Sequence, residues 1–167
     1  MLDLSDPDSP RAEAYLEQEA DLRDIVVSPD GTLAAYSSNE SGGNEVYVRS
    51  FPEPGERTLV SEGGGELPFW SPDGNTVYYW RAGGPTEVFR AARLRRDPTP
   101  VVLRTDSLFT GGAYYEEDSD LHPDGDRLVI PLLQAVGATA LEGAAAEPER
   151  FLVVTDWFEE LLARVGN

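Results

Sequence analysis

The sequence predicts an all-β protein made of three consecutive four-stranded β-propeller blades, a half-propeller, followed by a short C-terminal helix. The main observation is a turn sequence, Ser/His-Pro-Asp-Gly, that occurs three times, beginning at Ser28, Ser71 and His122. The first two copies begin 43 residues apart, and the second and third 51 residues apart. Each copy separates two apolar runs. Units of about 40 to 50 residues that each hold four short strands are typical of propeller blades.

The three turn sequences are interpreted as structural. Proline presets the backbone for a tight turn, aspartate caps the turn through its side chain, and glycine takes the positive φ. Asp30, Asp73 and Asp124 could suggest a repeated acidic site. We interpret each of them instead as part of the turn that connects the first strand of a blade to the second.

The first two blades are expected to share one anatomy. Blade A should cover residues about 23–61, with strands at 24–27, 32–37, 45–49 and 56–61, and blade B about 66–105, with strands at 67–70, 76–80, 86–91 and 100–105. These runs are rich in β-branched and aromatic residues, which favour strands. Glu45-Val46-Tyr47 of blade A is echoed 42 residues later by Glu87-Val88-Phe89 of blade B.

Aromatic residues are concentrated in blade B. Because a single blade cannot bury both of its faces, neighbouring blades must stack on each other. We therefore expect these aromatic side chains to pack between blades rather than to bind a ligand. They are Phe69, Trp70, Tyr78, Tyr79, Trp80 and Phe89.

The two ends of the chain depart from the pattern. Blade C is expected over residues about 112–155, with strands at 111–121, 127–132 and 151–155, a loop at 134–150 and no fourth strand. A helix is predicted at 157–165, with Asp156 as its N-cap and Glu159 completing a capping box. Residues about 12–18 are predicted to form a strand without a blade of its own, which is available to complete a blade. Propeller rings normally have four to eight blades.

The composition is strongly acidic. Asp and Glu number 31 against 13 basic residues, all of them Arg, which gives a net charge of −18. Such a surface repels nucleic acid and anionic lipid, so neither is expected as a partner. A GC-rich genome and adaptation to salt explain this bias as well as a function does. We expect a soluble chain without a signal peptide, a transmembrane segment or a disulfide, and the compartment stays open.

No set of residues predicts catalysis. A Gly-x-Ser-x-Gly nucleophile motif is absent, and the single histidine, His122, is interpreted as a turn residue that replaces serine. The acidic run at Glu116, Glu117, Asp118 and Asp120 could offer oxygen ligands to Ca²⁺, but a solvated acidic edge explains it better. We therefore predict no catalytic, cofactor-binding or metal-binding residues and no enzymatic activity.

Several stretches resemble the TolB-like propeller repeat, in particular the form found in the C-terminal region of some bacterial serine/threonine protein kinases. They are SPDGTLAAYSSNESGGNEVYVRSFP and GGGELPFWSPDGNTVYYW, together with the ending VVTDWFEELLARV. Asp156 stands where the family commonly has Asn, and His122 replaces the turn serine. The resemblance implies a propeller of roughly six blades that follows a kinase and a membrane helix. This chain contains the last three blades and no kinase motif.

These observations lead to two functional hypotheses. The first is a non-enzymatic binding or protein-interaction module that buries its open flanks against a second half-propeller, most simply as a homodimer with a six-bladed ring. By resemblance its task would be extracytoplasmic sensing for a signalling protein. The alternative is the propeller subdomain of a serine peptidase or other hydrolase whose catalytic domain lies elsewhere.

Overall fold

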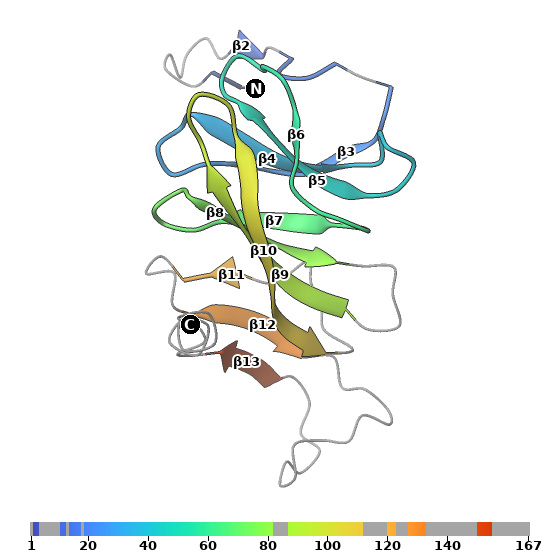
Figure 1. Cartoon of the computed structure of the whole chain (residues 1–167), viewed down its shortest axis with the longest axis vertical. Coiled ribbons are helices and arrows are strands. Elements are labelled where there is room, and N and C mark those ends of the chain that lie inside the picture. Colours follow the sequence, from blue (N-terminus) through green and yellow to red (C-terminus); the bar gives the residue numbers. More distant parts are fainter. Residues whose placement is uncertain are drawn as a thin grey trace, which may run out of the picture.

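A computed structural model describes residues 2–3, 11–12, 14–17, 19–81, 87–111, 120–122, 127–132 and 150–154. In this part of the chain all regular structure is β. Three antiparallel sheets follow one another along the molecule, and a two-stranded ribbon of β1 (Leu2–Asp3) and β2 (Arg11–Ala12) precedes them (Figure 1). The predicted all-β class is confirmed.

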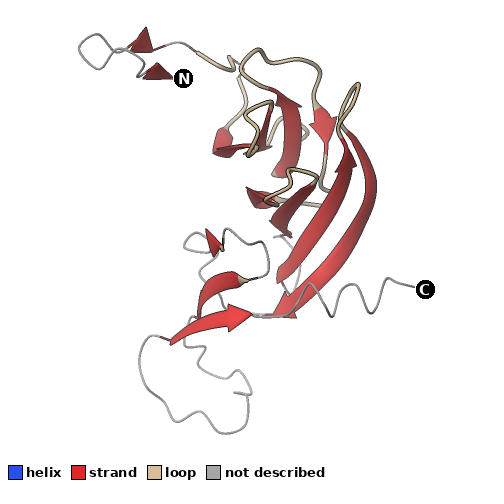
Figure 2. Cartoon of the chain, turned by 90° about the vertical axis from the view of Figure 1, so that its left-hand side faces the viewer, coloured by secondary structure: helices blue, strands red, loops and turns tan. Residues whose placement is uncertain are grey.

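Blades A and B are both four-stranded meanders, in which each strand pairs with the next one along the chain. Blade A consists of β3 (Leu22–Val27), β4 (Leu33–Ser38), β5 (Glu45–Ser50) and β6 (Thr58–Leu59), and blade B of β7 (Glu66–Trp70), β8 (Thr76–Arg81), β9 (Glu87–Arg95) and β10 (Val101–Gly111). Figure 2 shows the length of β9 and β10, which extend well past the other strands. This arrangement is that of successive propeller blades.

The third sheet has the order β11-β12-β13, formed by β11 (Asp120–Leu121), β12 (Leu128–Leu132) and β13 (Arg150–Val154). The prediction that its first strand begins at residue 111 was wrong at that position, because Gly111 pairs with Glu87 at the end of β10 in blade B. The predicted loop at 134–150 lies outside the described residues except for Arg150, and the predicted helix at 157–165 lies entirely outside them.

The two turns that the structure describes have the predicted chemistry. Ser28 donates a hydrogen bond from Oγ to the Asp30 carboxylate (2.7 Å), and Ser71 does the same to Asp73 (2.5 Å). Each serine Oγ also accepts the N–H of the residue that follows the turn, Leu33 or Thr76. The glycines at positions 31 and 74 have φ of 71° and 68°, a region that favours glycine.

The strand pairing shows that the sequence similarity between the third strands of blades A and B is out of register by one residue. Tyr36 pairs with Tyr47, whereas Trp80 pairs with Phe89 and Tyr79 with Arg90. The structural offset between the blades is therefore 43 residues, not 42, since Tyr36 corresponds to Tyr79. A shift of one residue moves a side chain to the other face of a strand, so Tyr47 corresponds to Arg90 and not to Phe89.

The core lies between the blades, as predicted for the aromatic residues. Trp70 and Tyr79 pack against blade A, and Tyr78, Trp80 and Phe89 point to the opposite face, where Leu108 and Leu121 contact them and Phe69 lies partly buried. Blade A contributes Leu33, Ala35, Val46, Val48 and Val60 to the first of these clusters. Side chains that alternate between the two faces of β8 thus join blade B to both of its neighbours.

The N-terminal segment differs from its prediction. Among the described residues of the strand predicted at 12–18, Ala12 lies in a strand, where it pairs with Leu2, and residues 14–17 form no strand. Tyr15 provides contacts between this segment and blade A. Its ring packs against Phe51 at a centroid distance of 5.3 Å, and its hydroxyl donates a hydrogen bond to the Ser50 carbonyl (2.5 Å). These contacts hold the segment against blade A.

Candidate functional site

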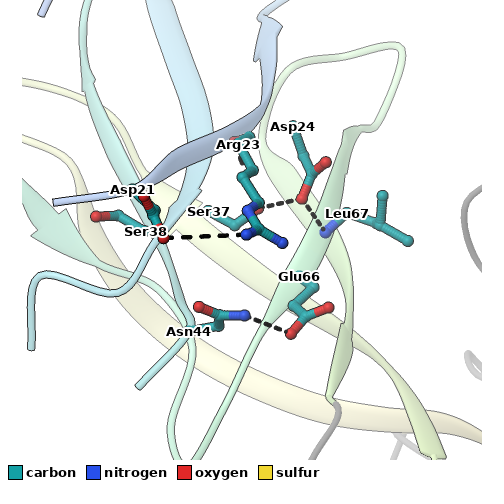
Figure 3. Close-up of a pocket in the computed structure, with 8 residues that line it drawn as sticks. All are labelled: Asp21, Arg23, Asp24, Ser37, Ser38, Asn44, Glu66 and Leu67. Carbon is teal, nitrogen blue, oxygen red and sulfur yellow. Dashed lines mark hydrogen bonds and ion pairs between the residues drawn. The ribbon is translucent and has the colours of Figure 1, made fainter. Parts of the chain in front are cut away.

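The first candidate surface is a polar cavity of about 370 Å³ at the seam between blades A and B. It lies where β3 and β7 begin and β4 ends, at the opposite end of these strands from the Pro-Asp-Gly turns. Figure 3 shows the residues that line it: Asp21, Arg23, Asp24, Ser37, Ser38, Asn44, Glu66 and Leu67. Five of the eight come from residues 21–24, 66 and 67, next to the first strands of the two blades.

The backbone at this seam is unusual at two equivalent positions. Asp24 has φ of 53° and Leu67, which lies 43 residues later, has φ of 51°. Each lies at an irregularity in the pairing of the first strand with the second, as expected of a β-bulge. The Asp24 carboxylate accepts hydrogen bonds from the Ser37 hydroxyl and from the Leu67 N–H (3.4 Å), so the bulge joins the two blades.

The cavity is acidic, with three carboxylates and one guanidinium. Asn44 donates a hydrogen bond to Glu66 across the seam (2.7 Å), and Arg23 lies 3.9 Å from Asp21 in an exposed ion pair. Among the residues that the structure describes, no three His, Asp or Glu side chains lie close enough together to hold a metal ion. The contacts of this cavity connect the blades, and we assign it a structural role.

A second seam contact joins the turn of blade A to blade B. Arg96, which follows β9, donates hydrogen bonds to both carboxylate oxygens of Asp30 (2.8 and 2.7 Å) and to the Thr32 hydroxyl (2.6 Å). Its guanidinium also lies over the ring of Trp70, 6.0 Å from the ring centroid. The hydrogen bond from Arg96, with further ones from Ser28 and Thr32, holds the pKa of Asp30 well below its usual range.

Arg96→Ala is expected to lower the unfolding midpoint at neutral pH by removing this contact. Because the pKa of Asp30 is depressed in the folded state, the stabilisation is fully present above its unfolded pKa of about 3.8 and is lost as the pH falls through the lower folded value. Urea denaturation at pH 7 and pH 2 should show the difference between wild type and variant shrinking in acid. The control is the same substitution in an Asp30→Asn background. There Arg96→Ala should lower the free energy of unfolding at pH 7 by less than it does in the wild-type background. An equal cost at both pH values would contradict this account.

The residues considered for chemistry in the sequence are placed as follows. His122 is exposed, and its N–H donates a hydrogen bond to the Arg127 carbonyl (2.8 Å), the same bond that Ser28 and Ser71 make in the other two turns. Asp120 lies in β11. Asp124 and the acidic residues 116–118 lie outside the described residues, so the interpretation of this acidic run as a solvated edge without a metal stays a prediction.

The second candidate surface is the face of blade A that points away from blade B, which we call the open flank. Ile25 and Val27 lie on it and are 53% and 43% exposed. Their equivalents 43 residues later are Pro68, which is fully buried, and Trp70, which is 8% exposed. In blade B the residues at these two positions are buried against blade A. In blade A the residues at the equivalent positions are exposed to solvent.

The open flank has two parts. Its inner edge forms an apolar groove, and its centre is covered by a side chain of the same blade. The groove has a volume of about 480 Å³ and is lined mainly by apolar and aromatic side chains, together with Arg23 and Asp24: Leu22, Ile25, Val27, Tyr15, Leu16, Tyr36 and Phe51. At the centre, Arg57 lies over the ring of Tyr47 at 5.6 Å from the centroid. Leu59, which pairs with Tyr47, is 48% exposed at the outer edge. The sequence predicted open flanks without naming their residues, although the alternation of Ile25 and Val27 was a usable signal.

Comparison with known proteins supports the fold. No protein-family model matches the sequence. Among solved structures, the chain is similar to a putative TolB from Agrobacterium tumefaciens, with a TM-score of 0.58 and 18% identity over 84% of this chain and 47% of that one. It is also similar to the Pyrococcus horikoshii acylaminoacyl peptidase, with a TM-score of 0.59 and 18% identity over 84% of this chain and 24% of that one.

These similarities define the class of protein. The chain has a TolB-like β-propeller fold, and it spans about half the length of the TolB structure and about a quarter of the peptidase. An identity of 18% shows the fold alone, since this architecture carries many unrelated functions. Within the described residues, the structure has no helix with the length and apolar character needed to cross a membrane.

Proposed function

We propose that this chain is a non-enzymatic β-propeller module that acts by binding protein, and that its open flank packs against a blade of a second copy. The observation that carries the proposal is the exposure of Ile25 and Val27, at positions that the next blade buries as Pro68 and Trp70. Exposed apolar surface of this kind typically marks an interface.

The repeat also indicates which kind of surface can pack against the open flank. In the one seam described in full, the surface that meets Trp70 and Tyr79 is the apolar face of blade A, formed by Leu33, Ala35, Val46 and Val48. A blade face of this type is the matching partner for Ile25 and Val27. Within each copy blade B already covers this face of blade A, so in a closed ring the open flank would pack against the third sheet of a second copy, and two half-propellers make a ring of ordinary size.

The charge of the chain sets a condition on this association. Each copy has a net charge of −18, so two copies repel each other at low ionic strength. Salt screens this repulsion, with a Debye length of about 8 Å at 0.15 M, and does not weaken apolar contact. Association through the open flank should therefore strengthen as the salt concentration rises, unlike association through ion pairs.

Site-specific labelling tests the proposal, because the chain has no cysteine. In the variant Ile25→Cys, the thiol should react rapidly with a maleimide at low protein concentration and become protected as the concentration rises. The matched control is Leu103→Cys, on β10 of blade B, where Leu103 is 58% exposed and lies away from the open flank. Protection at position 25 alone supports the proposal, and equal reactivity of both thiols at every concentration would contradict it.

The similarity to the peptidase structure supports one alternative, that the chain is the propeller part of a hydrolase. In that case a different polypeptide segment covers the open flank, and the thiol at position 25 stays reactive at every concentration of this chain alone. A sensing role in a signalling protein, which the resemblance to kinase-linked propellers implies, would use the same interaction module.

A further inference from the structure

The open flank of blade A is partly occupied by the chain itself. Residues 14–17 lie against it, and Tyr15 provides their main contacts, through its ring against Phe51 and its hydroxyl to the Ser50 carbonyl. Leu16 borders the apolar groove next to Leu22. The segment therefore covers the part of this face around Phe51, while Ile25 and Val27 in the same groove stay exposed.

Strand pairing shows which position of the repeat Tyr15 contacts. Ser50 pairs with Leu33 as Arg93 pairs with Thr76. The Phe51 N–H donates to the Thr32 carbonyl (2.9 Å) as the Leu94 N–H donates to the Asn75 carbonyl (2.8 Å). Phe51 of blade A is therefore the structural equivalent of Leu94 in blade B.

Leu94 is one of the residues that blade B buries against its neighbour. It is 4% exposed and belongs to the cluster that Val48 and Val60 of blade A also form. At the equivalent position of blade A, the ring that covers Phe51 is that of Tyr15. Blade A covers this position on blade B. On blade A, Tyr15 covers the equivalent position.

We infer that residues 14–17 are an internal cap of the open flank, which a docking blade of a second copy displaces. This inference rests on the proposed function, because it concerns the same surface. The cap and an incoming blade compete for the area around Phe51, so the cap weakens self-association and keeps the flank partly covered in the single chain. The cap is displaceable because its described contacts are few: one ring contact, one hydrogen bond and the edge of the groove.

Variants of Tyr15 test this inference. Tyr15→Ala removes both contacts and should tighten self-association about tenfold, which corresponds to about 1.4 kcal/mol. Tyr15→Phe keeps the ring and removes only the hydrogen bond to Ser50, so its dissociation constant should lie between those of Tyr15→Ala and wild type. Sedimentation equilibrium gives the three constants, and circular dichroism verifies that each variant is folded.

Hydrogen exchange provides a readout that does not depend on a variant. If the cap is displaced, the protection of the amides of residues 14–17 from hydrogen exchange should fall as the chain associates. The protection of the amides of residues 22–27 should rise. A dimer that forms with the cap still protected, or that Tyr15→Ala leaves unchanged or weakens, would overturn the inference and leave the proposed function standing. If wild type and Tyr15→Ala both stay monomeric at the highest concentration reached, the proposed function fails and the inference fails with it.

Discussion

Replacement of Trp80 by alanine is expected to lower the free energy of unfolding by about 3–5 kcal/mol, the usual cost of truncating a large buried aromatic side chain. Trp80 is 0% exposed and its ring centroid lies 5.0 Å from that of Phe89. The indole lies on the side of blade B that meets Leu108 and Leu121, so its loss leaves a cavity next to the third sheet. Urea denaturation followed by far-ultraviolet circular dichroism measures the change.

The control for this variant is Leu103→Ala on the same blade. Leu103 is 58% exposed, so its truncation should change the free energy of unfolding by no more than about 0.5 kcal/mol. A cost for Trp80→Ala as small as that for Leu103→Ala would mean that blade B does not pack as described.

Ile25→Asp is expected to weaken self-association at least about a hundredfold, which corresponds to about 2.7 kcal/mol. The substitution places a carboxylate on the exposed inner edge of the open flank, next to Val27 and Leu22. Docking of an apolar blade would then bury an unpaired charge, which is costly. The folded single chain should be little affected, because Ile25 is already 53% exposed. Sedimentation equilibrium measures the dissociation constant.

The matched control is Leu103→Asp, which adds the same charge at a residue of similar exposure away from the open flank. It separates the local effect from the general repulsion between two acidic chains. If the two aspartate variants weaken association equally, net charge and not the open flank governs it, and the assignment of the interface is wrong.

Much of the fold could be predicted from the sequence because its signals are local. The turn chemistry depends on residues within a few positions of each other, and the structure confirms the predicted aspartate caps at Asp30 and Asp73 and the positive φ of the glycines that follow them. The burial of Trp70 and Trp80 follows from the need of each blade to cover two faces. Repeat length and turn sequence together therefore determined the architecture.

The candidate surfaces were harder to predict because they depend on contacts between distant residues. Arg96 donates hydrogen bonds to Asp30, which lies 66 positions earlier in the chain. Asp24 accepts a hydrogen bond from the backbone of Leu67, at a bulge that no local sequence pattern predicted. The echo between Tyr47 and Phe89 was misleading by one residue, because the strand pairing keeps the 43-residue spacing of the turns and places Arg90, not Phe89, opposite Tyr79. The strand predicted at 12–18 does not form at residues 14–17, where the ring of Tyr15 packs against Phe51.

The central claim is that this chain is a propeller module which associates through the open flank of blade A. The most direct test is the mass of the unmodified chain by sedimentation equilibrium, over a range of concentrations and at low and high salt. The expected result is a concentration-dependent rise from 18.3 kDa to twice that value, more complete at high salt. A mass of 18.3 kDa at every concentration and salt would contradict the claim.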